Sequence, residues 1–237
     1  MTFSIAGRDP ETGMLGVAVC TAVPGVGSLC PFVKAGVGAI ATQSFVNPYL
    51  GIDGLKLLAQ GMSAEEALEK LISDDPGAPV RQLGIVDNQG RSAAFTGDDC
   101  VPWAGHQTGP NFSAQANMIV DETTVPALAE GFMAGEGKPL PERLIDALAA
   151  GDATGGDFRG RQSVALKVFS TEGYPCCELR VDEHKDPVAE LKRVYAVAQQ
   201  QLLPFVSALP TRDNPLGLAP SDDDEIVNVL RKHVSER

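Results

Sequence analysis

The second residue of the chain is a threonine at the start of a strand-like segment, Thr2-Phe3-Ser4-Ile5. An initiator methionine is usually removed when the next side chain is small, and removal would leave Thr2 with a hydroxyl and a free α-amine. An α-amine titrates near pH ~7.7–8, so it can take the hydroxyl proton and turn the oxygen into a nucleophile. Many chains begin Met-Thr without such chemistry. Thr2 is therefore a catalytic candidate that needs support from the rest of the sequence.

A glycine- and arginine-rich segment, residues 155–163, is the second feature with chemical potential. Its glycines allow the backbone to approach a ligand closely, and Arg159 and Arg161 could grip a carboxylate. Gln162 and Ser163 stand at the entrance of the next strand, where they could donate hydrogen bonds into a cleft; we expect Asp157 and Gln162 to bind substrate and Ser163 to take part in catalysis. The alternative is a structured turn in which Asp157 pairs with one of the arginines.

The segment 96–109 contains the only tryptophan, Trp103, together with glycines and His106. An aromatic ring, glycines and a histidine in one loop are typical of a pocket wall. His106 could act as a base, but no acid at a fixed spacing marks a partner for it. A hydrogen-bonded structural histidine explains it as well.

Amide side chains mark two further segments. Gln115 and Asn117 alternate along an expected strand, so both face one side of it; they could line a site, and Asn117 could stabilise an oxyanion. A polar, solvated strand face is the alternative. Gln43 lies where an apolar strand ends in polar residues, as substrate-binding residues often do.

The elements that must position these residues follow a clear order. Hairpins are expected from turn residues between apolar runs, which favours antiparallel sheets over βαβ units. Helices would cover the outer faces of two packed sheets. The expected strands span 2–7, 14–21, 28–33, 37–43, 80–86, 91–95, 112–119, 162–170 and 176–182; the expected helices cover 54–60, a segment opened by a capping box at Ser63, 122–134, 139–150, a segment opened by Asp186-Pro187, and 222–234.

Length and composition limit the classes of protein. The 237 residues predict one domain, 1–203, followed by a proline-rich linker and short helix, 204–237. The net charge of −12 disfavours binding to nucleic acid or to anionic lipid. We find no signal peptide and no apolar run of the ~20 residues that a membrane helix needs, so a soluble, cytoplasmic protein is expected. The five cysteines fit neither a disulfide scaffold nor a metal-binding spacing, so we expect no metal and no cofactor.

Several segments together resemble the bacterial domain-of-unknown-function 1028 (DUF1028) family, over roughly residues 2–195. The family is similar to N-terminal-nucleophile (Ntn) hydrolases. The resemblance implies an α+β fold, a four-layer αββα sandwich of two antiparallel sheets. The segments that carry it are Thr2-Phe3-Ser4-Ile5, Asp9-Pro10-Glu11-Thr12-Gly13, Gly36-Val37-Gly38-Ala39, Ala41-Thr42-Gln43, Trp103-Ala104-Gly105-His106 and Gly155-Gly156-Asp157-x-Arg159-Gly160-Arg161-Gln162-Ser163.

The resemblance also implies a function. Ntn hydrolases cleave amide bonds with an N-terminal Thr, Ser or Cys, which makes Thr2 the nucleophile in this chain. Where an aspartate often follows the second strand in the superfamily, this chain has Thr21-Ala22. The leading hypothesis is an amidohydrolase acting on a small-molecule amide; the alternative is a non-catalytic Ntn-like protein that binds a ligand or assembles with partners. A cysteine nucleophile, Cys20 or Cys100 near His106, ranks lower, and homo-oligomerisation is compatible with either function.

Overall fold

A computed structural model describes residues 2–155 and 159–217. Asp157, Met1 and the expected helix 222–234 lie outside the described residues. The chain divides into two compact units with the boundary between Leu191 and Lys192. The domain boundary expected after residue 203 is a different division and stays a prediction.

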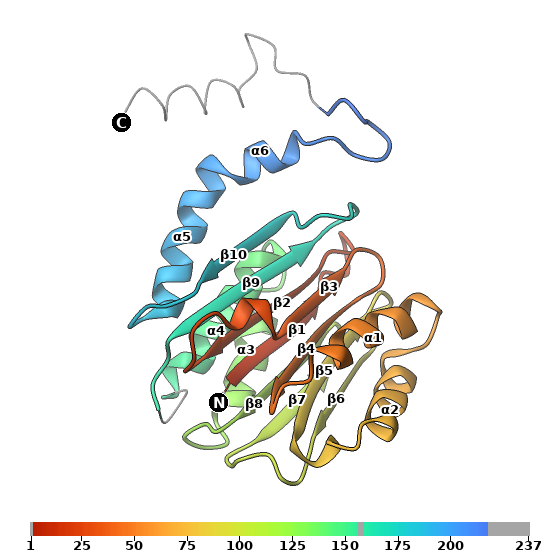
Figure 1. Ribbon diagram of the computed structural model, residues 1–237. Helices are drawn as coiled ribbons and strands as arrows, with labels where there is room; N and C mark the ends of the chain where they lie inside the picture. Colours follow the sequence, from red (N-terminus) through yellow and green to blue (C-terminus); the bar gives the residue numbers. More distant parts are fainter. Residues whose placement is uncertain (1, 156–158, 218–237) are drawn as a thin grey trace. The chain divides into compact units, whose positions relative to one another are not determined.

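The first unit contains two antiparallel sheets (Figure 1). The larger has six strands in the order β10-β9-β2-β1-β8-β7, so the N-terminal strand β1 lies inside the sheet rather than at its edge. The smaller has four strands in the order β3-β4-β5-β6. The strands are β1 (Thr2–Arg8), β2 (Leu15–Thr21), β3 (Pro31–Lys34), β4 (Gly38–Ser44), β5 (Arg81–Asp87), β6 (Ser92–Thr96), β7 (Gly105–Gly109), β8 (Phe112–Asn117), β9 (Ser163–Phe169) and β10 (Cys177–Val181).

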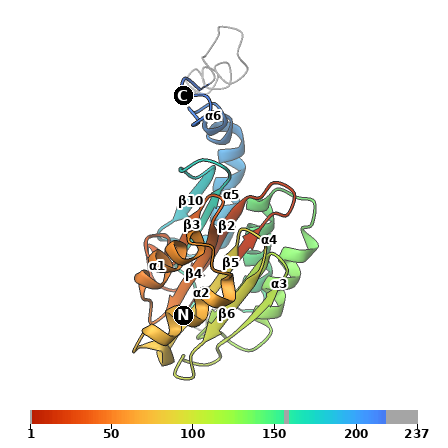
Figure 2. The ribbon, with the colours of Figure 1, turned by 90° about the vertical axis from the view of Figure 1, so that its right-hand side faces the viewer.

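Helices cover the outer face of each sheet. Helices α1 (Pro48–Ala59) and α2 (Ala64–Asp74) pack on the four-stranded sheet, and α3 (Thr124–Ala134) and α4 (Leu140–Ala153) pack on the six-stranded one. Figure 2 shows the resulting four layers from the side. The expected four-layer αββα sandwich of two antiparallel sheets is confirmed.

Alternation along β1 decides which residues face which layer. Phe3, Ile5 and Gly7 share the face under the helices. A Cβ at Gly7 would lie 2.8 Å from the Phe132 ring of α3 and 3.2 Å from Leu144 of α4, so glycine allows both helices to approach the strand. The other face carries Thr2, Ser4 and Ala6, and all three are buried.

The layer between the sheets has an apolar part and a polar part. The apolar part is a core of small and branched side chains that includes Val17, Val19, Ala39 and Ala41. At the opposite end of the same strands the buried side chains are hydroxyls and amides. The polar members are Thr2, Ser4, Thr21, Gln43, Gln82, Ser113, Gln115, Asn117 and Ser163.

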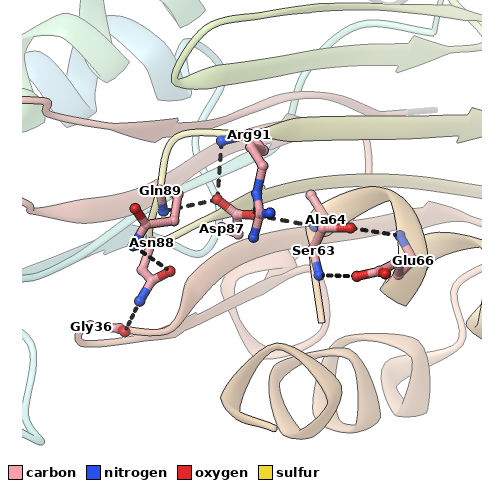
Figure 3. Close-up of polar contacts among 8 residues, drawn as sticks. All are labelled: Gly36, Ser63, Ala64, Glu66, Asp87, Asn88, Gln89 and Arg91. Atoms are coloured by element: carbon pink, nitrogen blue, oxygen red, sulfur yellow. Dashed lines mark hydrogen bonds and ion pairs between the residues drawn. The ribbon is translucent and has the colours of Figure 1, made fainter. Parts of the chain in front are cut away.

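The predicted capping box at the start of α2 is present. Ser63 Oγ accepts from Glu66 N at 3.2 Å, and Glu66 Oε2 accepts from Ser63 N at 2.8 Å. Figure 3 shows the buried Asp87 carboxylate beside this helix start, where it accepts from Ala64 N at 3.3 Å and from Arg91 Nε at 2.6 Å. An anion at a helix N-terminus is stabilised by the unpaired N–H groups there. Asp87 therefore ties α2 to the turn that joins β5 and β6.

Three local differences separate the structure from the expected elements. Helix α1 begins at Pro48 rather than 54, because Asn47 caps it by accepting from Tyr49 N at 3.1 Å. Residues 26–28 form a short 3₁₀ turn, so β3 starts later than expected. Strand β7 forms from the glycine-rich segment expected to be a loop.

Helix α5 (Pro187–Gln201) spans the boundary between the two units, and α6 (Leu203–Ser207) follows it within the second unit. The expected linker thus includes one short helix among its described residues. None of the helices in the described part of the chain has the length and hydropathy required to cross a membrane.

Candidate active site at the end of the central strand

Three candidate residues and Thr21 lie in one row across the six-stranded sheet. Thr2 at the start of β1 pairs with Asn117 at the end of β8 on one side and with Thr21 at the end of β2 on the other. Thr21 in turn pairs with Ser163 at the start of β9. Directly paired residues project to the same face of an antiparallel sheet, so all four side chains enter the layer between the sheets. Residues from four separate segments of the sequence are therefore adjacent.

The Thr2 hydroxyl contacts a second hydroxyl. Thr2 Oγ1 and Thr21 Oγ1 are 3.1 Å apart, and either can be the donor. In the described part of the chain the hydrogen-bond partner of this hydroxyl is thus a neutral group rather than a lysine or a carboxylate. The Thr2 residue is 9% exposed, so it lies just below the surface at the end of its strand.

Two glutamines from the smaller sheet anchor this site from across the interior. Gln43 Nε2 donates to the Thr2 carbonyl at 3.2 Å and to Gln82 Oε1 at 2.7 Å. Gln82 Nε2 donates to the carbonyls of Ala116 at 2.8 Å and Gly105 at 3.1 Å. Carbonyl oxygens can only accept, so the orientation of the Gln82 amide is fixed and its Oε1 faces Gln43 and Asn117.

The orientation of Asn117 follows from that of Gln82. Asn117 Nδ2 donates to Gln82 Oε1 at 2.9 Å, which directs Asn117 Oδ1 away from Gln82. This oxygen is buried and has no hydrogen-bond partner among the described residues. A buried polar atom without a partner is rare in folded proteins and calls for an explanation.

Ser4 and Gln115 extend the same network one pair further along β1 and β8. Gln115 Nε2 donates to Ser4 Oγ at 2.6 Å, and Ser4 Oγ donates to Gln43 Oε1 at 2.7 Å. Gly84 of β5 lies opposite, where any Cβ would overlap the Gln115 amide oxygen. The expected common face of Gln115 and Asn117 is confirmed, and it is the protein interior rather than a solvated surface.

Ser163 serves the neighbouring turn. Its Oγ donates to the Val23 carbonyl at 2.6 Å and accepts from Val26 N at 3.1 Å. Both hydrogen bonds hold residues 23–26 at the end of β2. This geometry favours a structural role for the Ser163 hydroxyl, and the catalytic role suggested by the sequence stays a prediction.

Trp103 and His106 line an open pocket of about 600 Å³, whose lining includes neither Thr2 nor Asn117. The loop before β7 pairs with residues 118–119, directly after Asn117: Ile119 N donates to the Trp103 carbonyl at 3.2 Å. Thr96 Oγ1 accepts from Gln82 Nε2 at 2.9 Å and lies 2.8 Å from His106 Nδ1. A continuous chain of polar contacts therefore joins the pocket to Gln82 and Asn117.

The protonation of His106 follows from its surroundings. Its ring is exposed on one side, but the protein packed against the other side withdraws water, which lowers the pKa of His106. The contact between Thr96 Oγ1 and His106 Nδ1 fits either neutral tautomer, because a hydroxyl can donate or accept. The lowered pKa favours the neutral imidazole.

The arginine-rich segment approaches the site from the β9 side. Gln162 N donates to the Thr21 carbonyl at 2.8 Å, which places this residue one strand from Thr2. Arg161 Nε lies 2.7 Å from Asp152 Oδ1 of α4, an ion pair whose N–H is not aligned for a hydrogen bond. Burial raises the pKa of Asp152, against the lowering effect of Arg161. Arg161 is thus bound to the protein itself, and the substrate-binding roles predicted for Arg159, Arg161 and Gln162 stay predictions.

The cysteines give little support to a thiol nucleophile. Burial raises the pKa of both Cys30 and Cys177 to about 12, which disfavours their reactive thiolates. Cys100 lines the same pocket as His106, but its Sγ donates to the Arg81 carbonyl at 3.2 Å. His106 Nδ1 contacts Thr96 instead, so Cys100 and His106 do not form a nucleophile–base pair in this structure.

A family model supplies the decisive comparison. The family of unknown function DUF1028 matches residues 2–191, which include every strand of the described residues and the first four α-helices. The chain belongs to the DUF1028 family. Protein SPO2555 from Silicibacter pomeroyi, a solved structure assigned to the same family, is 29% identical, with a TM-score of 0.85 over 92% of this chain and 99% of that one.

Two other solved structures are far less similar to this DUF1028 chain. A Gly-1 mutant of Anbu from Hyphomicrobium sp. strain MC1 is 18% identical, with a TM-score of 0.41 over 85% of this chain and 96% of that chain. BPH of Thiobacillus denitrificans, solved with epoxomicin, is 12% identical, with a TM-score of 0.39 over 73% of this chain and all of the other. No curated protein sequence matches. These remote likenesses say nothing about the activity of the DUF1028 chain.

Three residues of the site were not singled out from the sequence: Gln82, Thr96 and Thr21 as a partner of Thr2. Gln82 begins an otherwise apolar strand, and a polar residue at that position is a weak signal. Thr96 opens the segment that contains Trp103, and only the packing of β6 against β7 brings it to His106. The pairing of Thr2 with Thr21 follows once the hairpin register is known.

Proposed function

We propose that, after removal of Met1, this protein is an N-terminal-nucleophile hydrolase that cleaves an amide bond of a small substrate with Thr2. The observation that carries the proposal is the position of Thr2. It starts a central strand, its hydroxyl is 3.1 Å from Thr21 Oγ1, and Asn117 beside it holds an unpartnered buried oxygen. DUF1028 membership supports the fold that such chemistry uses.

The reaction would proceed in two balanced steps. Thr2 Oγ1 attacks the substrate carbonyl carbon while its proton passes to the α-amine, and the resulting ammonium then protonates the leaving nitrogen as the C–N bond breaks. Water, deprotonated by the same amine, hydrolyses the ester on Thr2 and restores the hydroxyl. Backbone N–H groups or the second Nδ2 hydrogen of Asn117 would stabilise the oxyanion.

The pocket that Trp103 and His106 line is the proposed place of substrate recognition. Trp103 offers an apolar surface there, and the imidazole of His106 offers a polar group. The substrate-binding roles proposed for Arg159, Arg161 and Gln162 call for an acidic group on the substrate, and its carboxylate would compete with Asp152 for Arg161.

A Thr2→Ala variant tests the proposal in a screen of N-acyl amino acid amides and p-nitroanilides. Intact mass first establishes that the N-terminus is residue 2 in both proteins. We expect turnover by the wild type and a loss of at least about 10³-fold in the variant, because the nucleophile is removed. Equal turnover by both proteins would eliminate Thr2 as the nucleophile.

A second function is favoured by the same hydroxyl pair. Thr21 is neutral where a charged group could have activated Thr2, which fits a protein that binds a small amide without cleaving it. Thermal-shift measurements with the same compounds separate the two functions. A ligand that stabilises the protein and is recovered intact after long incubation supports binding alone.

A further inference from the structure

Asn117, the pair of Thr2 on β8, has an acceptor without a partner among the described residues, although an oxyanion requires a donor. Its amide nitrogen is directed to Gln82 Oε1, and Gln82 is itself fixed by donating to two backbone carbonyls. Rotating the Asn117 amide by half a turn would bring two oxygens face to face. The side chain is 1% exposed, so solvent does not satisfy its free Oδ1.

The backbone of β1 directs the Thr2 nitrogen toward the same strand. Arg8 N donates at 2.8 Å to the carbonyl of Asn111, the residue directly before β8. Along an antiparallel strand every second residue points its N–H to the same neighbour, so the nitrogen of Thr2 also points to β8. The residue of β8 that is paired with Thr2 is Asn117.

Removal of Met1 changes the donors at this nitrogen. A backbone amide has one N–H, which the ladder uses, whereas an α-ammonium has three. The additional N–H groups need acceptors when the strand end is buried. The nearest side chain on the paired strand is Asn117, with its oxygen free.

We propose that Asn117 Oδ1 accepts a hydrogen bond from the α-amine of the processed Thr2, with Gln82 as the positioning residue that turns this oxygen toward it. Asn117 then holds the base of the reaction in place rather than serving chiefly as an oxyanion donor. The inference rests on the proposed function for its catalytic meaning. The contact itself requires only that Thr2 is the first residue.

The α-amine pKa of Thr2 measures this contact without any turnover. The pH dependence of trace acetylation by acetic anhydride, followed on the N-terminal peptide by mass spectrometry, gives that pKa. The protein used is one whose mass proves that it begins at Thr2. Asn117→Leu should lower the pKa by about one pH unit because the ammonium loses an acceptor. Asn117→Asp should raise it because a negative oxygen favours the ammonium.

Gln115→Leu is the matched control. It makes the same amide-to-leucine change on the same strand and face, one pair away from Thr2, and should leave the α-amine pKa unchanged. A general loosening of the strand would shift the α-amine pKa in the same direction in all three variants. Shifts of opposite sign in Asn117→Leu and Asn117→Asp are therefore the diagnostic result. If Asn117→Leu fails to fold, Asn117→Asp alone decides by raising the pKa or not.

An α-amine pKa that is the same in the wild type and both Asn117 variants would overturn the inference. The inference would also be overturned if Gln115→Leu shifted the α-amine pKa as much as Asn117→Leu does. If the wild type hydrolyses no amide but the opposite shifts are found, the proposed function fails while the contact stands. If Thr2→Ala abolishes turnover but Asn117 does not affect the amine, the function stands and the contact fails.

Discussion

The hydroxyls and amides of the site form a directional network. Ser4 donates to Gln43, Gln43 donates to Gln82, and Asn117 donates to Gln82 as well. Each amide orientation is fixed by the next, which leaves one unpaired acceptor, Asn117 Oδ1, next to Thr2. In a low-dielectric interior such a network is rigid when satisfied and costly where it is not. The unpaired oxygen is therefore the best marker of the site in the described residues.

His106 makes the stability of the protein depend on pH. Its pKa is lowered in the folded state because surrounding protein removes water from the ring. The unfolded chain then binds a proton at His106 more readily than the folded protein does. The contribution of neutral His106 to folding stability is therefore fully present above the ordinary histidine pKa of ~6.5. It is lost as the pH falls through the lower pKa of the folded state. We expect the fall in melting temperature from pH 7.5 to pH 5.5 to be smaller in His106→Gln than in the wild type. An equal fall in both proteins would show that His106 does not titrate differently in the two states.

Some of the neighbours in the candidate site were expected from residue types. Thr2 was singled out for the α-amine that removal of Met1 would free, and Asn117 and Gln43 because amide groups interrupt apolar strands; the three lie together. The role of Ser163 in the turn at 23–26 could not be predicted, because it depends on a contact between segments about 140 residues apart. The orientation of each amide also depends on partners from the other sheet, which no local pattern contains.

Hairpins and helices were predictable because their signals are local. The turn between β1 and β2 and the capping box of α2 depend on a few adjacent residues. Strand β7 was not predicted, because its glycines lower strand propensity. It forms through pairing with β8 and through Ser92 Oγ, which donates to the Gly109 carbonyl at 2.8 Å.

The approach of β5 to β8 depends on Gly84. A methyl group there would overlap the Gln115 amide oxygen and lie 2.7 Å from Ser113 Oγ. We expect Gly84→Ala to destabilise the protein by about 1–3 kcal/mol, the usual cost of overpacking, as measured by urea unfolding. Gly173→Ala is the matched control, since a Cβ there meets nothing within 4 Å, and it should change stability by less than about 0.5 kcal/mol. If the two variants had equal free energies of unfolding, β5 and β8 could move apart at Gly84 without loss of stability.

The whole chain combines a family domain with a shorter second unit. The DUF1028 match ends at residue 191, and the first unit ends there as well. The strands that the structure describes and the proposed site precede that point. The homo-oligomer allowed by the sequence stays a prediction, which native mass spectrometry would test.

Truncation tests the predicted domain boundary. We expect a chain ending at residue 203 to unfold cooperatively, with a melting temperature within a few degrees of the full-length protein, because the proline-rich segment begins at Pro204. Differential scanning calorimetry of both proteins gives the comparison. A large fall in melting temperature in the truncated protein would place residues 204–237 within the same folding unit.

The central claim is that Thr2 acts only with a free α-amine. A variant with a lysine inserted between Met1 and Thr2 keeps the Thr2 side chain but retains the methionine, because a long side chain in second position blocks its removal. We predict that wild-type protein with a verified N-terminal Thr2 hydrolyses members of the amide panel, and that the insertion variant, folded by circular dichroism, is slower by at least about 10³-fold. Equal hydrolysis by the insertion variant would contradict the account.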